Sequence, residues 1–471
     1  MSLTSTLRGA LAGASLLVLA ACSTVGPSYR SPAPSVPAQT AFVGASSAAF
    51  SAEQPPGEWW RLYQDPVLDG LVTQALAANT DLRVAAANLA QARAVLREVQ
   101  AGRRVSTTLG ASASYGQGSA AAAGFPDALD PEASFDVGLD AGYQLDLFGG
   151  IRRAITASAT DVEAVQAGYD VVRITVAAET ARAYSDACGF GQQLQTAQRT
   201  LGLQEQSVGI TRRSVAAGRG NGLDVARAAA LLEQTRASIP TLEAQRRAAL
   251  FRLSVLTGRP PAEFPAEADR CAAPPTLSSA LPVGDGAGLL RRRPDVRQAE
   301  RRLAAATERV GVATAELYPS VSLGASIGST ATDAGDLFSR RGLNFGLGPL
   351  ISWNFPNRTV ARARIAQSEA AAEAALAQFD GTWLNALNET ESALTRYANE
   401  LERAAALRAA RDQSAEALRL ARLRFSAGAE NFLTVLDAER TLAQAEQALS
   451  QSQAQLSTNQ VSVFLALGGG W

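Results

Sequence analysis

The chain has 471 residues and a formal net charge of −1 at pH 7, so its overall charge gives no reason to expect a nucleic acid partner. All of its basic residues are arginine, histidine is absent and methionine occurs once. Because the commonest general base and the usual soft metal ligands are missing, the composition argues against an enzyme, a cofactor and a metal site.

The first residues are typical of a secretory signal. Arg8 supplies a positive charge, and the apolar run at 11–21 is too short to span a bilayer as a helix. The run ends in Leu-Ala-Ala-Cys at 19–22, which is similar to the lipobox of bacterial lipoproteins. We therefore expect a signal peptide at 1–21 and acylation of Cys22. An ordinary signal peptide with an incidental cysteine is the alternative.

The segment 22–58 is rich in serine, proline and alanine, which predicts an extended, acylated tether and not a core element. Serine rather than aspartate at position 23 resembles lipoproteins that are sorted to the outer membrane. The folded part begins at Trp59, and an amphipathic helix is predicted from about 67 to 103.

Four segments then alternate between apolar and polar residues with a period of two, as strands do. They lie at about 105–115, 135–147, 319–328 and 343–354. Each has one apolar face and one face of Gly, Ser, Asp and Asn, and their lengths suit tilted membrane strands of roughly 9–11 residues. The pattern predicts lipid outside and a water-filled lumen inside; a soluble two-faced sheet is the alternative.

Very long helices follow each pair of strands, at 151–217 and 358–427. At 1.5 Å per residue such helices are roughly 100 Å long, so we expect them to project from the membrane. Each ends at a glycine tip and is followed by a returning helix, at 223–256 or 433–467. Apolar residues recur every seven positions in the returning helices, which favours coiled-coil packing.

The chain repeats itself. The segments 214–258 and 424–468 align without a gap at an offset of 210 residues, so that Gly218 falls on Gly428. A repeat of this length predicts two copies of one large unit, at 59–270 and 271–471, with tips at about 218–222 and 428–432. Four strands cannot close a barrel, because two open edges in lipid would leave backbone groups unpaired. The pattern predicts an oligomer with 8, 12 or 16 strands.

Two cysteines remain, Cys188 and Cys271. Counting helical rises from the tip places both in the same mid-length zone of the hairpin. In an oxidising periplasm they could form a disulfide. Two unpaired buried thiols are the alternative.

The chain resembles outer membrane efflux channels of the TolC type, and within them the OprM/NodT-like lipoprotein subgroup. The resemblance covers 22–471 and rests on six motifs: Gly26–Tyr29, Trp59-Trp60, Asp65–Leu68, Arg292–Val296, Tyr318–Ser320 and Asn431–Ala438. It implies a mainly α-helical protein with membrane β-structure. Three chains would form a 12-stranded β-barrel, four strands from each, continued by a coiled-coil α-helical barrel in the periplasm.

By the same resemblance, we expect a passive, gated conduit of a tripartite efflux system in the outer membrane. Its partners would be two further copies of the chain, a periplasmic adaptor (membrane fusion) protein and an inner-membrane pump of the RND type. It would export small molecules or drugs. The residues themselves do not specify the cargo, the pump or the adaptor.

The resemblance also implies a gate at the periplasmic tip. The residues that match the gate ring of OprM-like members are Leu433, Asp437 and Arg440. Spacings of four and three place them on one helix face, and an ordinary surface ion pair is the alternative. The aligned residues of the first copy are Leu223-Arg227-Ala230, so only the second copy carries the charged ring.

The latch of TolC itself is not expected here, because its positions hold Phe425, Glu430 and Asp224. Phenylalanine has no hydroxyl to donate, and Glu430 opposite Asp224 would repel. The tip turns at Gly218 and Gly428, within 212–222 and 422–431, are the predicted contacts with the adaptor.

Two other functions stay open from the sequence. A type I secretion channel uses the same fold with a different pump. A coiled-coil envelope lipoprotein without a pore would explain the helices but not four strands with the length and the two-faced pattern of membrane strands.

Overall fold

The computed structural model describes residues 24–32, 40–124, 126–277, 279–353, 355 and 358–469. The predicted signal peptide and Cys22 lie outside these residues. The chain divides into two compact units, which are considered separately. The sheet unit contains Met1–Pro32, Leu89–Val165 and Ala299–Phe379, and the hairpin unit contains Ala33–Asn88, Gln166–Gln298 and Asp380–Trp471.

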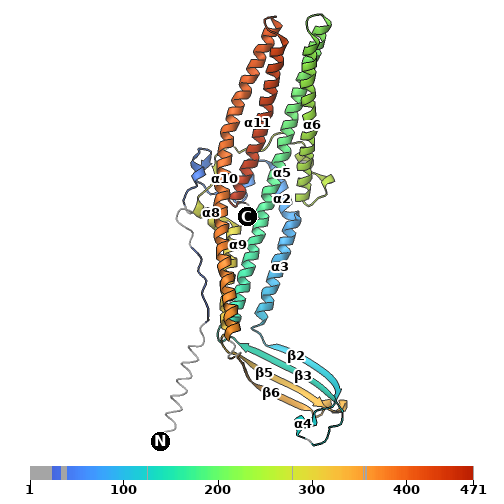
Figure 1. The fold of residues 1–471 in the computed structure, drawn as a ribbon, viewed down its shortest axis with the longest axis vertical. Helices are drawn as coiled ribbons and strands as arrows, with labels where there is room; N and C mark the ends of the chain where they lie inside the picture. Colours follow the sequence, from blue (N-terminus) through green and yellow to red (C-terminus); the bar gives the residue numbers. More distant parts are fainter. Residues whose placement is uncertain are drawn as a thin grey trace. The chain divides into compact units, whose positions relative to one another are not determined.

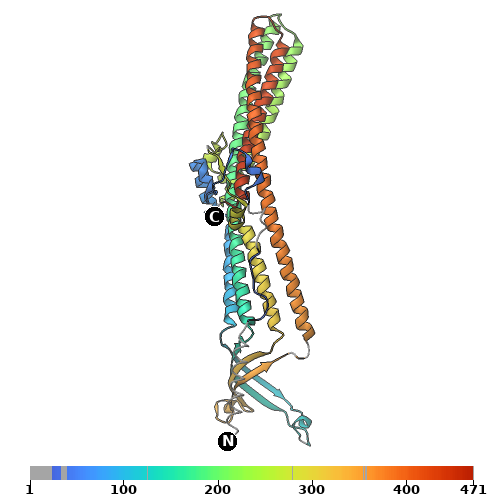
Figure 2. The same cartoon turned by 90° about the vertical axis from the view of Figure 1, so that its left-hand side faces the viewer.

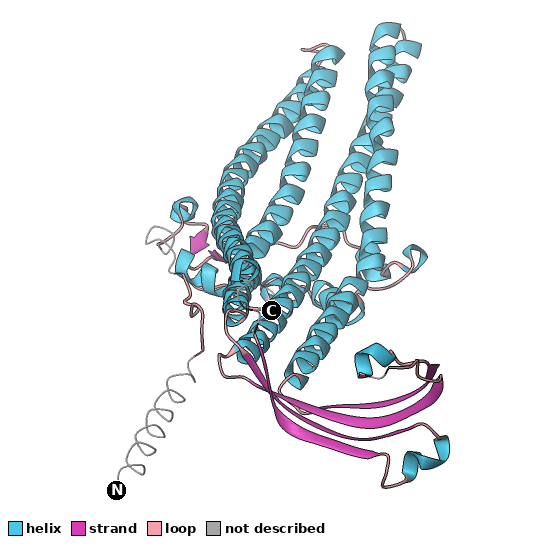
Figure 3. Ribbon diagram, turned by 60° about the horizontal axis from the view of Figure 1, so that its bottom comes forward, coloured by secondary structure: helices cyan, strands magenta, loops and turns pink. Residues whose placement is uncertain are grey.

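The sheet unit is built on four antiparallel strands that form one curved sheet (Figure 3). They are β2 (Ser106–Gly116), β3 (Glu132–Leu145), β5 (Ser320–Ala331) and β6 (Leu343–Ser352), in the order β2-β3-β5-β6. Each lies within a few residues of a segment that alternates in the sequence. The register aligns four apolar side chains across the sheet: Leu109, Leu139, Ile327 and Phe345. Alternation along each strand therefore becomes a difference between the two faces of the sheet.

Two long helices run through both units: α5 (Gly150–Ala216) and α10 (Arg358–Ser426). In the hairpin unit each is followed by a returning helix of 35 residues, α6 (Gly222–Leu256) or α11 (Phe432–Ala466). Figures 1 and 2 show each returning helix beside the long helix that precedes it. The helix ends lie within two residues of the predicted ends. None of the described helices is both long and apolar enough to cross a bilayer.

The helix predicted at 67–103 is two helices, α2 (Pro66–Ala78) and α3 (Thr80–Ala101). Asn79 interrupts it with an extended backbone (ψ 135°), and its side-chain oxygen accepts the Asp81 amide at 2.8 Å. A residue that caps a new helix favours a break over continuation. The prediction of one helix was wrong because amphipathic spacing continues across the break.

Asp65 caps α2 and also joins it to α5. Its Oδ1 accepts the Val67 amide at 2.9 Å, and its Oδ2 accepts the Tyr184 hydroxyl at 2.9 Å. Burial, reinforced by the Asp65 carboxylate, raises the pKa of Tyr184, so the phenol remains a neutral donor. Asp65, the first residue of the Asp65–Leu68 motif, is thus both a helix cap and a tertiary contact.

The core of the hairpin unit gathers residues from both halves of the chain. Trp59, in η3 (Trp59–Tyr63), is fully buried and stacks on Phe464 of α11 with ring centroids 4.7 Å apart. Leu253 of α6 and Leu394 of α10 are fully buried in the same core. Ring stacking adds about 0.5–1.5 kcal/mol to the burial of apolar area.

Part of the predicted tether is built into this core. Phe42 is buried, and β1 (Phe50–Ser51) pairs in parallel with β4 (Leu281–Pro282). The Glu391 carboxylate of α10 accepts the amides of Val43 and Gly44 at 2.8 and 2.7 Å. The prediction that 22–58 contributes nothing to a core was therefore wrong for 40–58. The remaining elements are the 22-residue helix α9 (Pro294–Ala315) and six short ones: η2 (Val43–Ser46), α4 (Ala120–Ala123), η4 (Pro261–Glu263), α7 (Ala266–Asp269), α8 (Gly286–Arg292) and η5 (Ala334–Phe338).

Cys188 of α5 is joined to Cys271 by a disulfide in the hairpin unit, with Cα atoms 4.8 Å apart. Two glycines of α5 allow the close packing around it. A Cβ on Gly189 would lie 2.7 Å from Ala454 Cβ, and one on Gly191 would lie 2.4 Å from the Cys271 carbonyl oxygen. The helix is continuous here, so these glycines serve close approach.

Candidate functional site

Both tip turns of the hairpin unit are built by the same local chemistry. Gly218 and Gly428 have left-handed φ angles of 71° and 72°, which favour glycine. Each turn closes with a Schellman pair of bonds: Arg219 N–H to Ser214 O at 2.9 Å and Gly218 N–H to Val215 O at 3.0 Å in the first hairpin, with the same pattern in the second. Asn221 and Asn431 then cap the returning helices.

The structure brings the three predicted gate residues onto one exposed face of α11. Asp437 and Arg440 form an ion pair, and their side chains are 61% and 57% exposed. Leu433 is 46% exposed on the preceding turn. An exposed pair of this kind contributes little to stability. Both charged groups are accessible to solvent on this face of α11.

The positions that match the latch of TolC, where no latch was expected, have partners within their own hairpin. The Phe425 ring packs against Phe432 with centroids 5.4 Å apart. Glu430 lies 3.5 Å from Arg424 Nη2, and its Oε1 accepts the Thr434 hydroxyl at 3.1 Å. Asp224 lies in the first turn of α6, where its backbone amide is bound by Asn221. Phe425 and Glu430 thus both interact with residues of the second tip, which carries Gly428.

Glu439, which the sequence pattern did not single out, lies buried behind the exposed face of α11. It is 6% exposed, and its Oε1 accepts the Ser207 hydroxyl of α5 at 2.7 Å and Arg422 Nη2 of α10 at 2.7 Å. One turn earlier, Leu436 packs with the first hairpin and Val435 with α10. Glu439 therefore ties α11 to α5 and α10. Its place one turn beyond two apolar positions was the signal that could have revealed it.

Glu439 is one end of a polar seam between α5 and α11. Seven side-chain pairs join the helices: Ser207–Glu439, Thr200–Glu446, Thr196–Ser450, Gln192–Gln453, Asp186–Thr458, Ser185–Ser457 and Arg182–Ser462. From Arg182 to Ser207 along α5, the partners on α11 run backwards from Ser462 to Glu439, so the two helices are antiparallel. Each such bond contributes a net of about 0.5–1.5 kcal/mol. The two halves of the chain are thus joined here by directional contacts.

A groove of about 480 Å³ lies between α5, α6 and α11 and has a mostly uncharged, polar lining. Among the described residues that line it, Arg440 is the one with a formal charge. The others are mostly amides and hydroxyls, including Gln193, Thr200, Gln234, Gln245, Gln444 and Gln447. Such a wall offers hydrogen bonds to many solutes without selecting for one charge.

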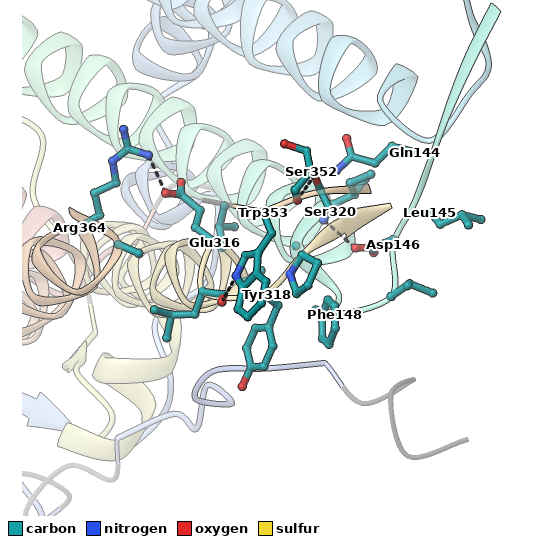
Figure 4. Close-up of a pocket in the computed structure, with 18 of the residues that line it drawn as sticks. Gln144, Leu145, Asp146, Phe148, Glu316, Tyr318, Ser320, Ser352, Trp353 and Arg364 are labelled. Atoms are coloured by element: carbon teal, nitrogen blue, oxygen red, sulfur yellow. Dashed lines mark hydrogen bonds and ion pairs between the residues drawn. The ribbon is translucent and has the colours of Figure 1, made fainter. Parts of the chain in front are cut away.

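In the sheet unit, an aromatic cluster lies where the strands meet the helices, around a cavity of about 770 Å³ (Figure 4). The rings of Phe148 and Tyr318 stack with centroids 4.5 Å apart, and Trp353 Nε1 donates to Leu317 O at 3.2 Å. The Asp146 carboxylate accepts the first amides of α5, including that of Ile151 at 3.0 Å. Aromatic residues at one end of membrane strands are typical of a membrane–water interface.

Within the described residues, no group of three or more His, Cys, Asp or Glu side chains could hold a metal ion.

A family model described as "Outer membrane efflux protein" matches residues 71–259 and 288–469. The chain belongs to this family. Over 97% of both chains it is 31% identical to the pyoverdine export outer membrane protein OpmQ of Pseudomonas aeruginosa, and 30% identical to the solvent efflux pump outer membrane protein SrpC of Pseudomonas putida. The solved structure of the outer-membrane channel OprN is 37% identical, with a TM-score of 0.89 over 95% of this chain and all of that one. The chain is therefore an outer membrane protein.

Proposed function

We propose that the protein is the outer membrane channel of a tripartite efflux system, a passive gated conduit that exports small molecules with an RND-type pump. The sheet carries the argument, because a four-stranded sheet with one apolar and one Gly/Ser/Asp-rich face is connected directly to two long helical hairpins. The family match and the efflux relatives support it. Nothing in the proposal requires an enzymatic step.

We propose that three chains close the barrel. The outer strands of the sheet, β2 and β6, have almost every residue exposed, and among the described residues each pairs with a strand on one side alone. Open edges in lipid leave backbone groups unpaired, so other copies must cover them. Side chains would fill the lumen of an eight-stranded barrel, whereas twelve strands leave a wider lumen. A Gly-rich inner face suits the wider barrel.

In the trimer, the two halves of the chain would act as near-equivalent repeats and supply six hairpins around the tunnel. The matching tip turns at Gly218 and Gly428 support this symmetry. The gate would have threefold symmetry, because Asp437 and Arg440 occur in the second hairpin and the first has Arg227 and Ala230 at the aligned positions. Three Asp437–Arg440 pairs around a narrow axis would set a charged constriction.

We propose that the hairpin tips, at 212–222 and 422–431, contact a periplasmic adaptor, and that acylated Cys22 anchors the mature chain. The groove lining, which is uncharged apart from Arg440, supports a conduit that does not select its cargo. The names of OpmQ and SrpC refer to such different solutes as pyoverdine and solvents. We therefore assign the choice of cargo to the pump.

Single-channel conductance of the purified full chain in planar bilayers tests the proposal. We expect small, rarely open pores from the wild type and larger, longer openings from an Asp437→Ala/Arg440→Ala variant. The matched control is Arg227→Ala, which removes an arginine from the aligned position of the first hairpin and should leave the conductance unchanged. A purified trimer that forms no pores even as the double variant would refute the channel. Co-purification with a type I secretion pump instead of an RND pump would redirect the proposal to secretion.

A further inference from the structure

A second cavity lies on the apolar face of the sheet, close to the loop that joins β5 and β6. Its volume is about 410 Å³, and all four strands line it. Most of the strand side chains that line it are apolar, namely Leu109, Val137, Leu139, Ile327 and Leu343, and Ser329 and two glycines complete the strand lining. The loop contributes Leu337, Phe338, Ser339 and Arg340.

The floor of this cavity is continuous because of the strand register. Leu139 lies directly opposite Leu109 on one side and Ile327 on the other. Leu109 is 75% exposed and Ile327 is 53% exposed. An exposed apolar row of this kind is unfavourable in water and is suited to hydrocarbon.

The rim carries one aromatic side chain and one cation, Arg340, and a second cation, Arg341, follows next in the chain. Phe338, at the end of η5, is 94% exposed, and Arg340 and Arg341 follow it on an exposed loop. Within the part of the chain that the structure describes, neither arginine forms an ion pair with Asp333 or Asp336 of the same loop. The Asp333 carboxylate instead accepts the Gly335 amide at 2.8 Å and caps η5.

The position of the loop defines which leaflet it would meet. β5 begins after α9 and β6 is followed by α10, so the β5–β6 loop lies at the end of the sheet away from the helices. If the helices are periplasmic, as in the proposed channel, this loop reaches the outer leaflet. Aromatic side chains with arginine beside them are typical of the level of lipid headgroups.

We propose that this cleft, the loop site, binds a phosphorylated lipid of the outer leaflet. One acyl chain lies on the Leu109–Leu139–Ile327 floor, Phe338 covers it, and Arg340 and Arg341 hold the phosphate. A guanidinium matches a phosphate with paired, charge-assisted hydrogen bonds, and each buried methylene adds about 0.8 kcal/mol. The charge and the apolar floor together favour such a lipid over a peptide or a free anion. The inference rests on the proposed barrel orientation.

Native mass spectrometry of the purified full-length trimer, titrated with diphosphorylated lipid A, tests the loop site. We expect saturable binding that Arg340→Ser/Arg341→Ser weakens at least tenfold and that Phe338→Ala weakens severalfold. The matched control is Arg103→Ser/Arg104→Ser, which removes an exposed arginine pair between α3 and the first residue of β2. This variant should bind lipid A as the wild type does.

Two further measurements separate the lipid from its competitors and from the channel. Phosphatidylcholine and millimolar inorganic phosphate should not displace lipid A. Equal loss in both arginine double variants, or equal binding of phosphatidylcholine and lipid A, would overturn the loop site in favour of a non-specific lipid shell. Planar-bilayer conductance of the Arg340→Ser/Arg341→Ser variant should stay unchanged. Pores formed by this variant would show that the channel is intact even if lipid A failed to bind. A wild-type protein that forms no pores would instead count against the proposed channel.

Discussion

Replacing Glu439 with alanine should favour an open tip. Glu439 is the buried carboxylate that joins α11, which carries Asp437 and Arg440, to the two long helices. Without it, α11 keeps its apolar contacts through Val435 and Leu436 and the rest of the α5–α11 seam, but loses the bonds to Ser207 and Arg422. We expect the helix to move away from α5 more readily.

The magnitude follows from the two contacts. The Ser207 hydroxyl donates to a buried carboxylate at 2.7 Å, and a bond of this charged kind contributes about 1.5–3 kcal/mol. The Arg422 side chain is 45% exposed, so solvent screening reduces its share to about 0.2–1 kcal/mol. The sum is about 2–4 kcal/mol. If both contacts exist only with the tip closed, their loss shifts the closed-to-open equilibrium by roughly 30- to 700-fold.

Single-channel recording of Glu439→Ala, Ser207→Ala and the double variant measures this shift. The open fraction should rise in each single variant, and the double variant should add little to Glu439→Ala because both changes remove the same bond. Glu439→Gln, which keeps the shape and an acceptor oxygen, should lie between the wild type and Glu439→Ala. The matched control is Glu416→Ala, which removes an exposed acid paired with Arg419 on α10 and should leave the open fraction unchanged.

A Glu439→Ala trimer that folds and keeps the wild-type open fraction would refute this reasoning. Coupling between Ser207 and Glu439 that appeared in unfolding but not in conductance would show that the contact stabilises the fold and not the closed tip.

Three other predictions concern the hairpin unit. Without reductant, neither Cys188 nor Cys271 should react with a thiol reagent, and labelling of both thiols would contradict the disulfide. Cys188→Ser should lower the free energy of unfolding by about 4–5 kcal/mol, because the bond closes a loop with a separation of 83 residues. Gly189→Ala should destabilise in denaturant, because about 1–3 kcal/mol of overpacking against Ala454 exceeds the helix-propensity gain, whereas Gly202→Ala, with open space around it, should stabilise by about 0.5–1 kcal/mol. Burial raises the pKa of Asp186 above its ordinary 3.8, so the folded state binds the proton more readily than the unfolded state and this residue costs stability as pH rises through its folded pKa. Asp186→Asn should therefore be the more stable protein at pH 7, with a difference that disappears below about pH 4 in parallel denaturation curves; a less stable variant at pH 7 would show that the charge is needed.

Much of the fold could be predicted because its signals are local. Alternation placed β2, β3, β5 and β6 within a few residues, and glycine at 218 and 428 placed the tip turns, because only a residue without a Cβ adopts that φ at low cost. The break at Asn79 was missed because its amphipathic neighbours continue the helical period on both sides. The β1–β4 pair was missed because strands of two residues carry no measurable period.

That the three proposed gate residues share one face was predictable for the same reason as the turns. Leu433, Asp437 and Arg440 share a face because they lie on one helix, and helical spacing is a property of the sequence. Glu439 was missed because its role depends on Ser207, which is 232 residues away in the chain.

Signals between near neighbours in the chain were therefore enough to place the four long strands, the four long hairpin helices and the glycine turns, but not the break at Asn79 or the β1–β4 pair. Which polar residues of the long helices meet could be read from the folded chain alone. The α5–α11 seam pairs residues that are separated by more than 200 positions, and many polar side chains along both helices could have served equally well by composition. The choice among them is made by how the two helices pack, through the small residues and apolar contacts that fix their distance and register.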